Sequence, residues 1–159
     1  LFRSPGIEVV RVMKSEGLFE NEEIVDATYY KDENNECWLF LNKGYRNKAE
    51  LHIYKIDSLQ LKRIEPHKAN PVKIDSQTAR NGGPVFKYEN HYYRPSQVNS
   101  HGKYGNGLNI NKIVQLDTNT YIEEKIITVA PNFKKGLVGL HHLHQVNDYF
   151  IFDVCQKLK

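Results

Sequence analysis

The stretch T-A-R-N-G-G-P-V-F-K-Y-E-N-H-Y-Y-R-P-S-Q, residues 78–97, is the basis of the fold prediction. An apolar run at residues 84–88 and an aromatic run at 91–94 flank the pair Glu89-Asn90, which suits a two-residue hairpin turn. The same order of apolar strand, short polar turn and aromatic strand recurs in two other segments, residues 24–41 and 140–154. The sequence therefore predicts a protein built from repeated β-hairpins.

Short strand-like runs also fill most of the remaining chain. They lie at residues 7–13, 24–30, 37–41, 50–56, 110–116, 121–129, 140–146 and 149–154. Asn147-Asp148 is a second two-residue turn candidate. No stretch keeps a helical period over three turns, and only residues 58–63 could form a helical turn. The fold class expected is all-β.

The three hairpins indicate a structural repeat. Trp38, Tyr92 and Phe150 occupy comparable places in them, 54 and 58 residues apart. Four strands in about 40–50 residues make one blade of a β-propeller, and glycines at Gly82-Gly83 and Gly139 suit close packing near a central axis. We therefore expect a partial propeller of about three blades, with a β-sandwich as the alternative.

The blade prediction divides the chain into four parts within one domain. Residues 1–23 would end a preceding blade, 24–75 and 76–135 would each form a blade-like unit, and 136–159 would start a further blade. A ring needs at least four blades. Because the chain also begins with Leu and not Met, we expect a fragment of a longer protein, or a ring completed by another chain or domain.

Composition excludes several classes of protein. The chain has 159 residues, 40% of them hydrophobic and 26% charged, which is ordinary for a soluble globular protein. The net charge of +3 comes from scattered Lys and Arg, so no nucleic acid is expected as a partner. No apolar run approaches the roughly 18 residues of a membrane span. We expect a soluble protein and favour the cytoplasm, with Cys37 and Cys155 as buried free thiols or one disulfide.

Polar residues at the starts of first strands are the leading site candidates, since these strands line the channel of a propeller. Asp26 stands in the apolar run I-V-D-A-T-Y-Y, where burial costs several kcal/mol unless the carboxylate is paired or hydrated. It could be a catalytic or ligand-binding group, or a partner of a neighbouring arginine. Arg80 could hold a carboxylate, a phosphate or sugar hydroxyls through its donor fork, or form an Arg–Asp tie between blades.

Four further residues extend this candidate site. Arg94 and Gln97 lie where the strand of the second hairpin ends, and either could bind a polar ligand or anchor the loop. Tyr104 lies in a glycine-rich loop that could act as a lid. In the motif H-H-x-H we favour His141 as the histidine that faces a ligand. The motif offers too few ligands for zinc, so neither a metal nor another cofactor is expected.

Glycoside hydrolysis would need a second carboxyl group beside Asp26. The candidates are Asp75, Glu123, Glu124 and Asp153. Alternation along a strand would place Glu123 and Glu124 on opposite faces, and an exposed outer strand is the usual explanation of such a pair. The sequence nominates none of the four as the general acid.

Five motifs in chain order carry a resemblance to a known family. They are N-P-V (70–72), A-R-N-G-G-P-V-F (79–86), Y-R-P-S-Q (93–97), Y-G-N-G-L-N-I-N-K-I (104–113) and G-L-H-H-L (139–143), preceded by W-L-F at 38–40. Across residues 24–154 the chain resembles the glycosidase-like propeller domain found beside glycosyltransferases. One example is the N-terminal part of plant glucosamine inositolphosphorylceramide transferases.

The resemblance implies a five-bladed propeller, similar in fold to arabinanases and fructosidases, that handles sugars. It implies that Arg80, Arg94, Gln97 and His141 lie near a central pocket and that Asp26 is the acid at the start of a blade. The Arg-Asp-Pro motif typical of the hydrolases is absent, because Asn81 and not Asp follows the arginine.

Two functions follow from these observations. The first is a carbohydrate-active or carbohydrate-binding domain that takes a glycan or sugar conjugate. Asp26 would be its acid/base or orienting group, Arg80 and Arg94 would supply charge-assisted hydrogen bonds, and a tyrosine, Tyr92, Tyr93 or Tyr104, would stack on the sugar. The second is a non-catalytic protein-interaction or structural propeller module. Convergence of the polar candidates on one concave mouth favours the first.

Overall fold

A computed structural model describes residues 19, 21–44, 50–99 and 104–157. These residues form thirteen β-strands and no helix, which confirms the all-β prediction. The strands are β1 Ile24–Lys31, β2 Cys37–Lys43, β3 Glu50–Ile56, β4 Ile64–Pro66, β5 Lys73–Ile74, β6 Phe86–Tyr88, β7 His91–Gln97, β8 Leu108–Leu116, β9 Tyr121–Val129, β10 Leu137–Gly139, β11 Leu143–Val146, β12 Tyr149–Phe152 and β13 Cys155–Gln156. The strand expected at residues 7–13 lies outside the described residues.

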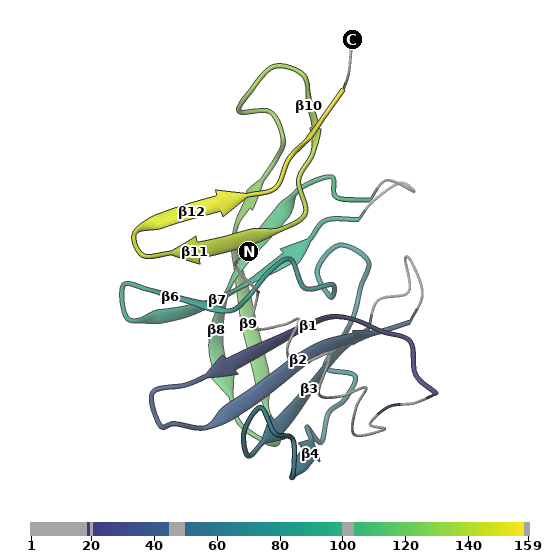
Figure 1. Cartoon of the computed structure of the whole chain (residues 1–159), viewed down its shortest axis with the longest axis vertical. Helices are drawn as coiled ribbons and strands as arrows, with labels where there is room; N and C mark the ends of the chain where they lie inside the picture. Colours follow the sequence, from purple (N-terminus) through teal and green to yellow (C-terminus); the bar gives the residue numbers. More distant parts are fainter. Residues whose placement is uncertain (1–18, 20, 45–49, 100–103, 158–159) are drawn as a thin grey trace.

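The strands form two larger antiparallel sheets and two small ones (Figure 1). The first sheet has the order β1-β2-β3-β4, with β5 also paired to β3, and the second has the order β6-β7-β8-β9. The hairpin β11–β12 and the pair β10–β13 follow. Each larger sheet is thus a meander of strands in chain order. No sheet closes on itself within the described part of the chain, so a complete ring stays a prediction.

Strand β2 shows why the first sheet forms. Its residues C-W-L-F-L-N are all buried, and alternate side chains enter two different apolar clusters. Leu39 and Leu41 pack on one face of the sheet, while Trp38 and Phe40 pack on the other. Each such side chain contributes about 1.5–3 kcal/mol through burial. A continuous apolar run fits this strand because both of its faces are covered.

The second of these clusters joins the two larger sheets. The ring of Phe40 contacts that of Tyr121 on β9 at 5.8 Å between centroids, and Tyr30 contacts Tyr92 on β7 at 5.0 Å. A third cluster, formed by Phe86, Leu108, Leu140 and Leu143, joins the second sheet to the β11–β12 hairpin. The sheets therefore stack in chain order, and each layer shares an apolar core with the next.

The predicted hairpin turns are confirmed. Glu89 and Asn90 both have positive φ, 45° and 61°, as a type I′ turn requires, and Asn147 has a φ of 54°. Residues 58–63 form a turn closed by a hydrogen bond from the Leu61 amide to the Ser58 carbonyl, not a helix.

Two other expectations have mixed outcomes. Both cysteines are free thiols, but Cys37 is buried in strand β2 whereas Cys155 is exposed on the short strand β13, which pairs with β10. The described residues contain no helix that is long and apolar enough to cross a membrane. A cytoplasmic location stays a prediction.

Candidate functional site

Asp26 lies at an irregularity in strand β1. The β1–β2 register shifts between Val25, which pairs with Asn42, and Thr28, which pairs with Phe40. Asp26 itself has a φ of 50°, a left-handed conformation that is uncommon outside glycine and in which Asp is enriched. Such bulges redirect a side chain out of the regular alternation of a strand. Here the bulge directs the carboxylate towards the second sheet.

The carboxylate of Asp26 binds two side chains from the segment that was expected to form the site. Arg80 donates from Nε to Asp26 Oδ2 at 2.5 Å, and Gln97 donates from Nε2 to the same oxygen at 3.3 Å. Gln97 Nε2 also donates to the Asn81 carbonyl at 2.8 Å, and the backbone amide of Gln97 donates to the Arg80 carbonyl at 2.8 Å. The structure therefore contains the Arg–Asp tie that the sequence offered as one alternative.

Aromatic rings continue this group towards the third hairpin. The guanidinium carbon of Arg80 lies 5.0 Å from the centroid of the Tyr104 ring, and that ring lies 5.0 Å from the ring of His141. His141 Nδ1 in turn lies 2.7 Å from Asp153 Oδ2. Since a carboxylate only accepts hydrogen bonds, Nδ1 carries the proton and Nε2 of a neutral His141 is an acceptor.

Asp153 fixes the backbone of the histidine segment as well. Its Oδ1 accepts the amide of His141 at 3.0 Å and the amide of His142 at 2.7 Å. We call Asp26, Arg80, Gln97, Tyr104, His141 and Asp153 the polar cluster. Burial, the largest influence, raises the pKa of Tyr104, with the charge of Arg80 opposing it, so Tyr104 is a neutral hydroxyl at physiological pH.

A small cavity of about 60 Å³ opens beside Asp26. It is lined by Asp26, Ala27, Thr28, Asn81, Gly83, Pro84 and His142. Burial lowers the pKa of His142, which keeps that ring uncharged at neutral pH. This volume suits a few water molecules or one small polar substituent of a larger ligand.

Gln97, which binds Asp26, carries an enclosed acceptor in its side-chain oxygen. Gln97 is 2% exposed, and its Oε1 accepts no hydrogen bond within the described part of the chain. The amide cannot simply be turned over, because Nε2 faces two acceptors, Asp26 Oδ2 and the Asn81 carbonyl. An unsatisfied buried acceptor of this kind costs about 1–3 kcal/mol.

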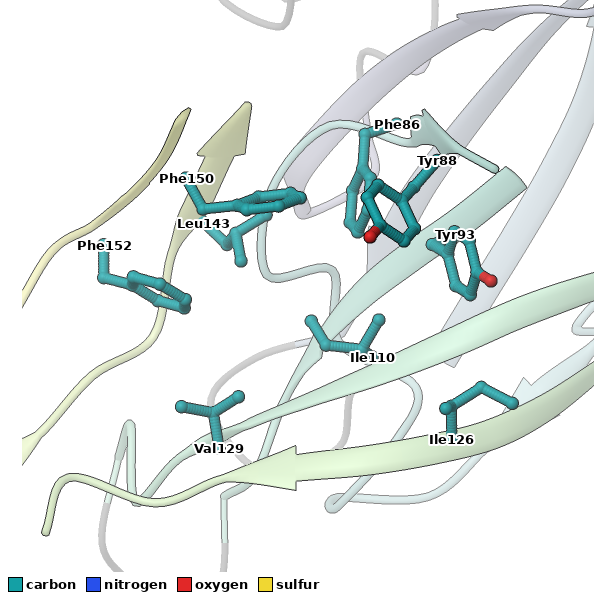
Figure 2. Close-up of a pocket in the computed structure, with 9 residues that line it drawn as sticks. All are labelled: Phe86, Tyr88, Tyr93, Ile110, Ile126, Val129, Leu143, Phe150 and Phe152. Carbon is teal, nitrogen blue, oxygen red and sulfur yellow. The ribbon is translucent and has the colours of Figure 1, made fainter. Parts of the chain in front are cut away.

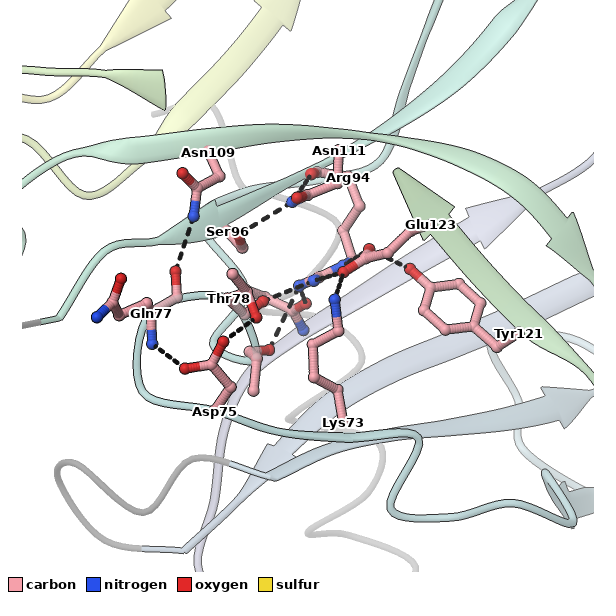
Figure 3. A network of polar contacts seen from close by, with 12 residues as sticks. Lys73, Asp75, Gln77, Thr78, Arg94, Ser96, Asn109, Asn111, Tyr121 and Glu123 are labelled. Atoms are coloured by element: carbon pink, nitrogen blue, oxygen red, sulfur yellow. Dashed lines mark hydrogen bonds and ion pairs between the residues drawn. The ribbon is translucent and has the colours of Figure 1, made fainter. Parts of the chain in front are cut away.

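Arg94 lies apart from the polar cluster, in a buried network between the sheets (Figure 3). It is fully buried and donates from Nε and Nη2 to Glu123 at 2.8 and 2.7 Å, from Nη2 to the Thr78 carbonyl at 2.7 Å, and from Nη1 to Asn81 Oδ1 at 3.1 Å. Protein groups thus engage the donors that were expected to bind a ligand. Arg94 braces Asn81, whose side chain in turn donates to the Asp26 carbonyl at 2.9 Å.

Glu123 is the anion of this network, and the expectation of an exposed Glu123-Glu124 pair is wrong for it. Its side chain is 2% exposed and also accepts hydrogen bonds from Lys73 and from the Tyr121 hydroxyl, the latter at 2.5 Å. Burial alone would raise the pKa of Glu123, but the charges and hydrogen bonds of Arg94 and Lys73 lower it to about 2. Glu124 is exposed, as expected.

The remaining candidates have clear positions. Asp75 closes a turn by accepting hydrogen bonds from the Gln77 amide and the Thr78 hydroxyl. Tyr92 packs against Tyr30, and Tyr93 stacks on Phe86, so of the three tyrosines Tyr104 is the one that reaches the polar cluster. No group of three or more metal-binding side chains occurs in the described ranges.

The polar cluster offers a defined set of interactions. The terminal amino groups of Arg80 and the Tyr104 hydroxyl can donate, Asp26 can accept, and the rings of Tyr104 and His141 offer flat faces. Fold and site together define an all-β protein of stacked antiparallel sheets, with a hydrogen-bonding and aromatic site where segments from three successive layers meet.

Comparison with known proteins identifies the family. Residues 13–147 match the family described as "Glucosamine inositolphosphorylceramide transferase 1, N-terminal", and the chain belongs to that family. Among curated proteins, it is similar to Glucosamine inositolphosphorylceramide transferase 1 of Oryza sativa subsp. japonica, with 35% identity over 105 residues, and to that of subsp. indica, with 34%. Each match covers 62% of this chain but only 14% of the relative's length. No solved structure matches the chain.

Proposed function

We propose that this chain is a carbohydrate-binding domain whose polar cluster holds a glycan or sugar conjugate. The observation that carries the proposal is the meeting of Asp26, Arg80, Tyr104 and His141, which are far apart in the sequence, in one partly exposed group. A sugar hydroxyl both donates and accepts hydrogen bonds, and charged partners such as Arg80 make those bonds stronger. Aromatic faces complement the apolar face of a sugar ring.

Binding fits this group better than hydrolysis. The carboxylate of Asp26 accepts hydrogen bonds from Arg80 and Gln97, and that of Asp153 accepts them from His141 and two backbone amides. A general acid must instead offer a proton to the leaving group. The name of the rice relatives, glucosamine inositolphosphorylceramide transferase 1, supports a sugar conjugate as the ligand.

The fold proposed around this site is a five-bladed propeller. Residues 24–75 and 76–135 would be two blades, since they contain the two meanders β1–β4 and β6–β9, and residues 136–159 would start another. The polar cluster would then lie at the inner ends of three adjacent blades. Residues 1–23 would end a preceding blade, and further chain or another subunit would complete the ring.

An open apolar groove supports such a completing partner (Figure 2). It has a volume of about 290 Å³ and lies between the second sheet and the β11–β12 hairpin. Phe86, Tyr88, Tyr93, Ile110, Ile126, Val129, Leu143, Phe150 and Phe152 line it. The same groove is the observation that favours the alternative function, a non-catalytic protein-interaction or structural module, because exposed apolar surface of this kind marks protein contacts.

A binding experiment separates the two functions. The folded chain is titrated with a panel of glycans and nucleotide sugars, together with Arg80→Ala and the matched control Arg63→Ala on an exposed turn. We expect at least one sugar to bind, Arg80→Ala to weaken it by about tenfold or more, and Arg63→Ala to leave it unchanged. Circular dichroism verifies that each variant is folded. Wild-type affinity in folded Arg80→Ala, or no binding by the folded wild-type chain, would refute the carbohydrate site.

A further inference from the structure

The connection between β9 and β10, residues 130–136, carries an exposed patch that the proposed sugar site does not use. In Figure 1 this connection projects beyond the sheets at one end of the molecule. Phe133 lies in it and is 59% exposed, and the next two residues, Lys134 and Lys135, are exposed as well. The Leu137 amide donates to the Lys134 carbonyl at 3.3 Å and so closes a turn around the lysines. The turn thus presents one large apolar ring beside two cations.

Strand β13 and the residue after it extend this patch. The amide of Lys157 donates to the Gly136 carbonyl at 3.0 Å, so a third exposed lysine starts beside the turn. Two valines on the neighbouring paired segments, Val138 and Val154, are 51% and 49% exposed. We call the following residues the basic tip: Phe133, Lys134, Lys135, Val138, Val154 and Lys157.

The positive charge of the basic tip is not neutralised within the described part of the chain. Residues 125–140 and 154–157 contain four lysines and no Asp or Glu, and the sequence at 100–103 and 158–159 has no acidic residue either. No ion pair among the described residues involves a lysine of the basic tip. Other lysines do pair with glutamates, among them Lys43, Lys55 and Lys73. The basic tip therefore has cations available for an anionic partner.

We infer that the basic tip docks on an anionic lipid bilayer, with the ring of Phe133 at the level of the headgroups and the three lysines on their charges. Anionic lipids attract nearby lysines, and an exposed apolar side chain gains by leaving water for the boundary between headgroups and acyl chains. The combination of an exposed ring, two exposed valines and unpaired lysines favours a bilayer over a nucleic acid. A bilayer offers apolar chains directly beneath its anionic charge.

Vesicle sedimentation tests the charge requirement. The whole chain is mixed with vesicles of phosphatidylcholine, or of phosphatidylcholine and phosphatidylserine in equal parts. We expect binding to the mixed vesicles that exceeds binding to phosphatidylcholine and weakens as salt is raised. The double variant Lys134→Gln, Lys135→Gln should bind the mixed vesicles about tenfold or more weakly. The control Lys62→Gln, Arg63→Gln removes the same charge from an exposed turn and should bind as the wild type does.

Tryptophan fluorescence tests the apolar contact. The chain has one tryptophan, Trp38, which is fully buried, so a tryptophan introduced at the surface reports its own surroundings. Emission of Phe133→Trp should shift to shorter wavelength on addition of the mixed vesicles. The control Tyr149→Trp, at a residue 75% exposed on the β11–β12 hairpin, should show no shift.

The outcomes decide between a bilayer and other partners. Equal binding to the two kinds of vesicle, equal loss in the two double variants, or no shift of Phe133→Trp would overturn the inference. Binding to soluble heparin without binding to mixed vesicles would also overturn it, in favour of a soluble polyanion. The wild-type comparison of the two vesicles decides the question even if a variant does not fold. Sugar binding by the polar cluster is measured separately, so its failure and that of the basic tip are distinguishable.

Discussion

Glu123 is the anion on which the buried Arg94 guanidinium depends, so Glu123→Gln should destabilise the fold strongly. The side chains of Arg94 and Glu123 are 0% and 2% exposed, and two charge-assisted hydrogen bonds of 2.8 and 2.7 Å join them. The variant keeps the shape of the side chain but leaves Arg94 with no charged partner, while Lys73 loses its own. Breaking a buried ion pair costs about 3–5 kcal/mol, out of a total stability of about 5–15 kcal/mol.

Urea unfolding at pH 7 measures this loss. Glu124→Gln is the matched control, because Glu124 is the next residue on β9 and is exposed, and its change in the free energy of unfolding should stay within about 0.5 kcal/mol. The double variant Arg94→Met, Glu123→Leu should recover part of the loss, since an apolar pair leaves no uncompensated charge. If Glu123→Gln cost no more than Glu124→Gln, the ion pair would not be what holds the two sheets together.

Two other predictions concern the same layers. Because the folded-state pKa of Glu123 is about 2 against an ordinary 4.5, its contribution is complete above pH 4.5 and is lost as the pH falls towards 2. The stability lost in this way amounts to about 3 kcal/mol. Between pH 7 and pH 2 the urea midpoint of the wild type should therefore fall more steeply than that of Glu123→Gln. Parallel plots of midpoint against pH would contradict this prediction. Gly83→Ala should cost about 2 kcal/mol or more, because at a φ of 140° its Cβ would lie 2.0 Å from the Leu143 carbonyl oxygen. Gly136→Ala is the control, because Gly136 also has a positive φ but its added Cβ would lie 3.5 Å from the nearest atom. It should lower the free energy of unfolding by less in the same urea assay, and an equal loss of stability would refute the clash at Gly83.

Much of the fold is readable from local sequence patterns. The strands Glu50–Ile56 and Tyr121–Val129 have the predicted bounds, and the predicted two-residue turns join β6 to β7 and β11 to β12. The strands β4, β5 and β13 are two or three residues long and exist because of their pairing partners, so no periodic pattern marks them. Closure of the sheets into a ring depends on long-range packing, and short-range signals do not determine it.

The site shows a similar division. Asp26, Arg80, Gln97, Tyr104 and His141 are brought together, as the sequence pattern and the family resemblance suggested. Arg94 is not, because its environment depends on Glu123, and a lone Glu-Glu pair on a strand gives no sign that one member is buried beside an arginine.

Asp153, one of the four candidate carboxyl groups, could have been placed beside His141 from the sequence. The predicted turn at Asn147-Asp148 sets the register of the hairpin, in which Val146 pairs with Tyr149 and Leu143 with Phe152. One step further along the ladder places residue 142 opposite Asp153, next to His141. Counting outwards from a predicted turn therefore singles out Asp153 among the candidate carboxyl groups, which a list of carboxylates alone does not do.

Asn81 explains how a site built on loop segments and one strand bulge can be rigid. Its amide accepts a hydrogen bond from Arg94 at 3.1 Å and donates one to the Asp26 carbonyl at 2.9 Å, while its backbone amide donates to Asn42 at 2.8 Å. The same buried network that joins the sheets thus stabilises the uncommon backbone conformation of Asp26. Interactions that order a site before the ligand arrives reduce the entropy lost on binding. Arg94 therefore serves the proposed function by positioning the groups that contact a sugar, without contacting the sugar itself.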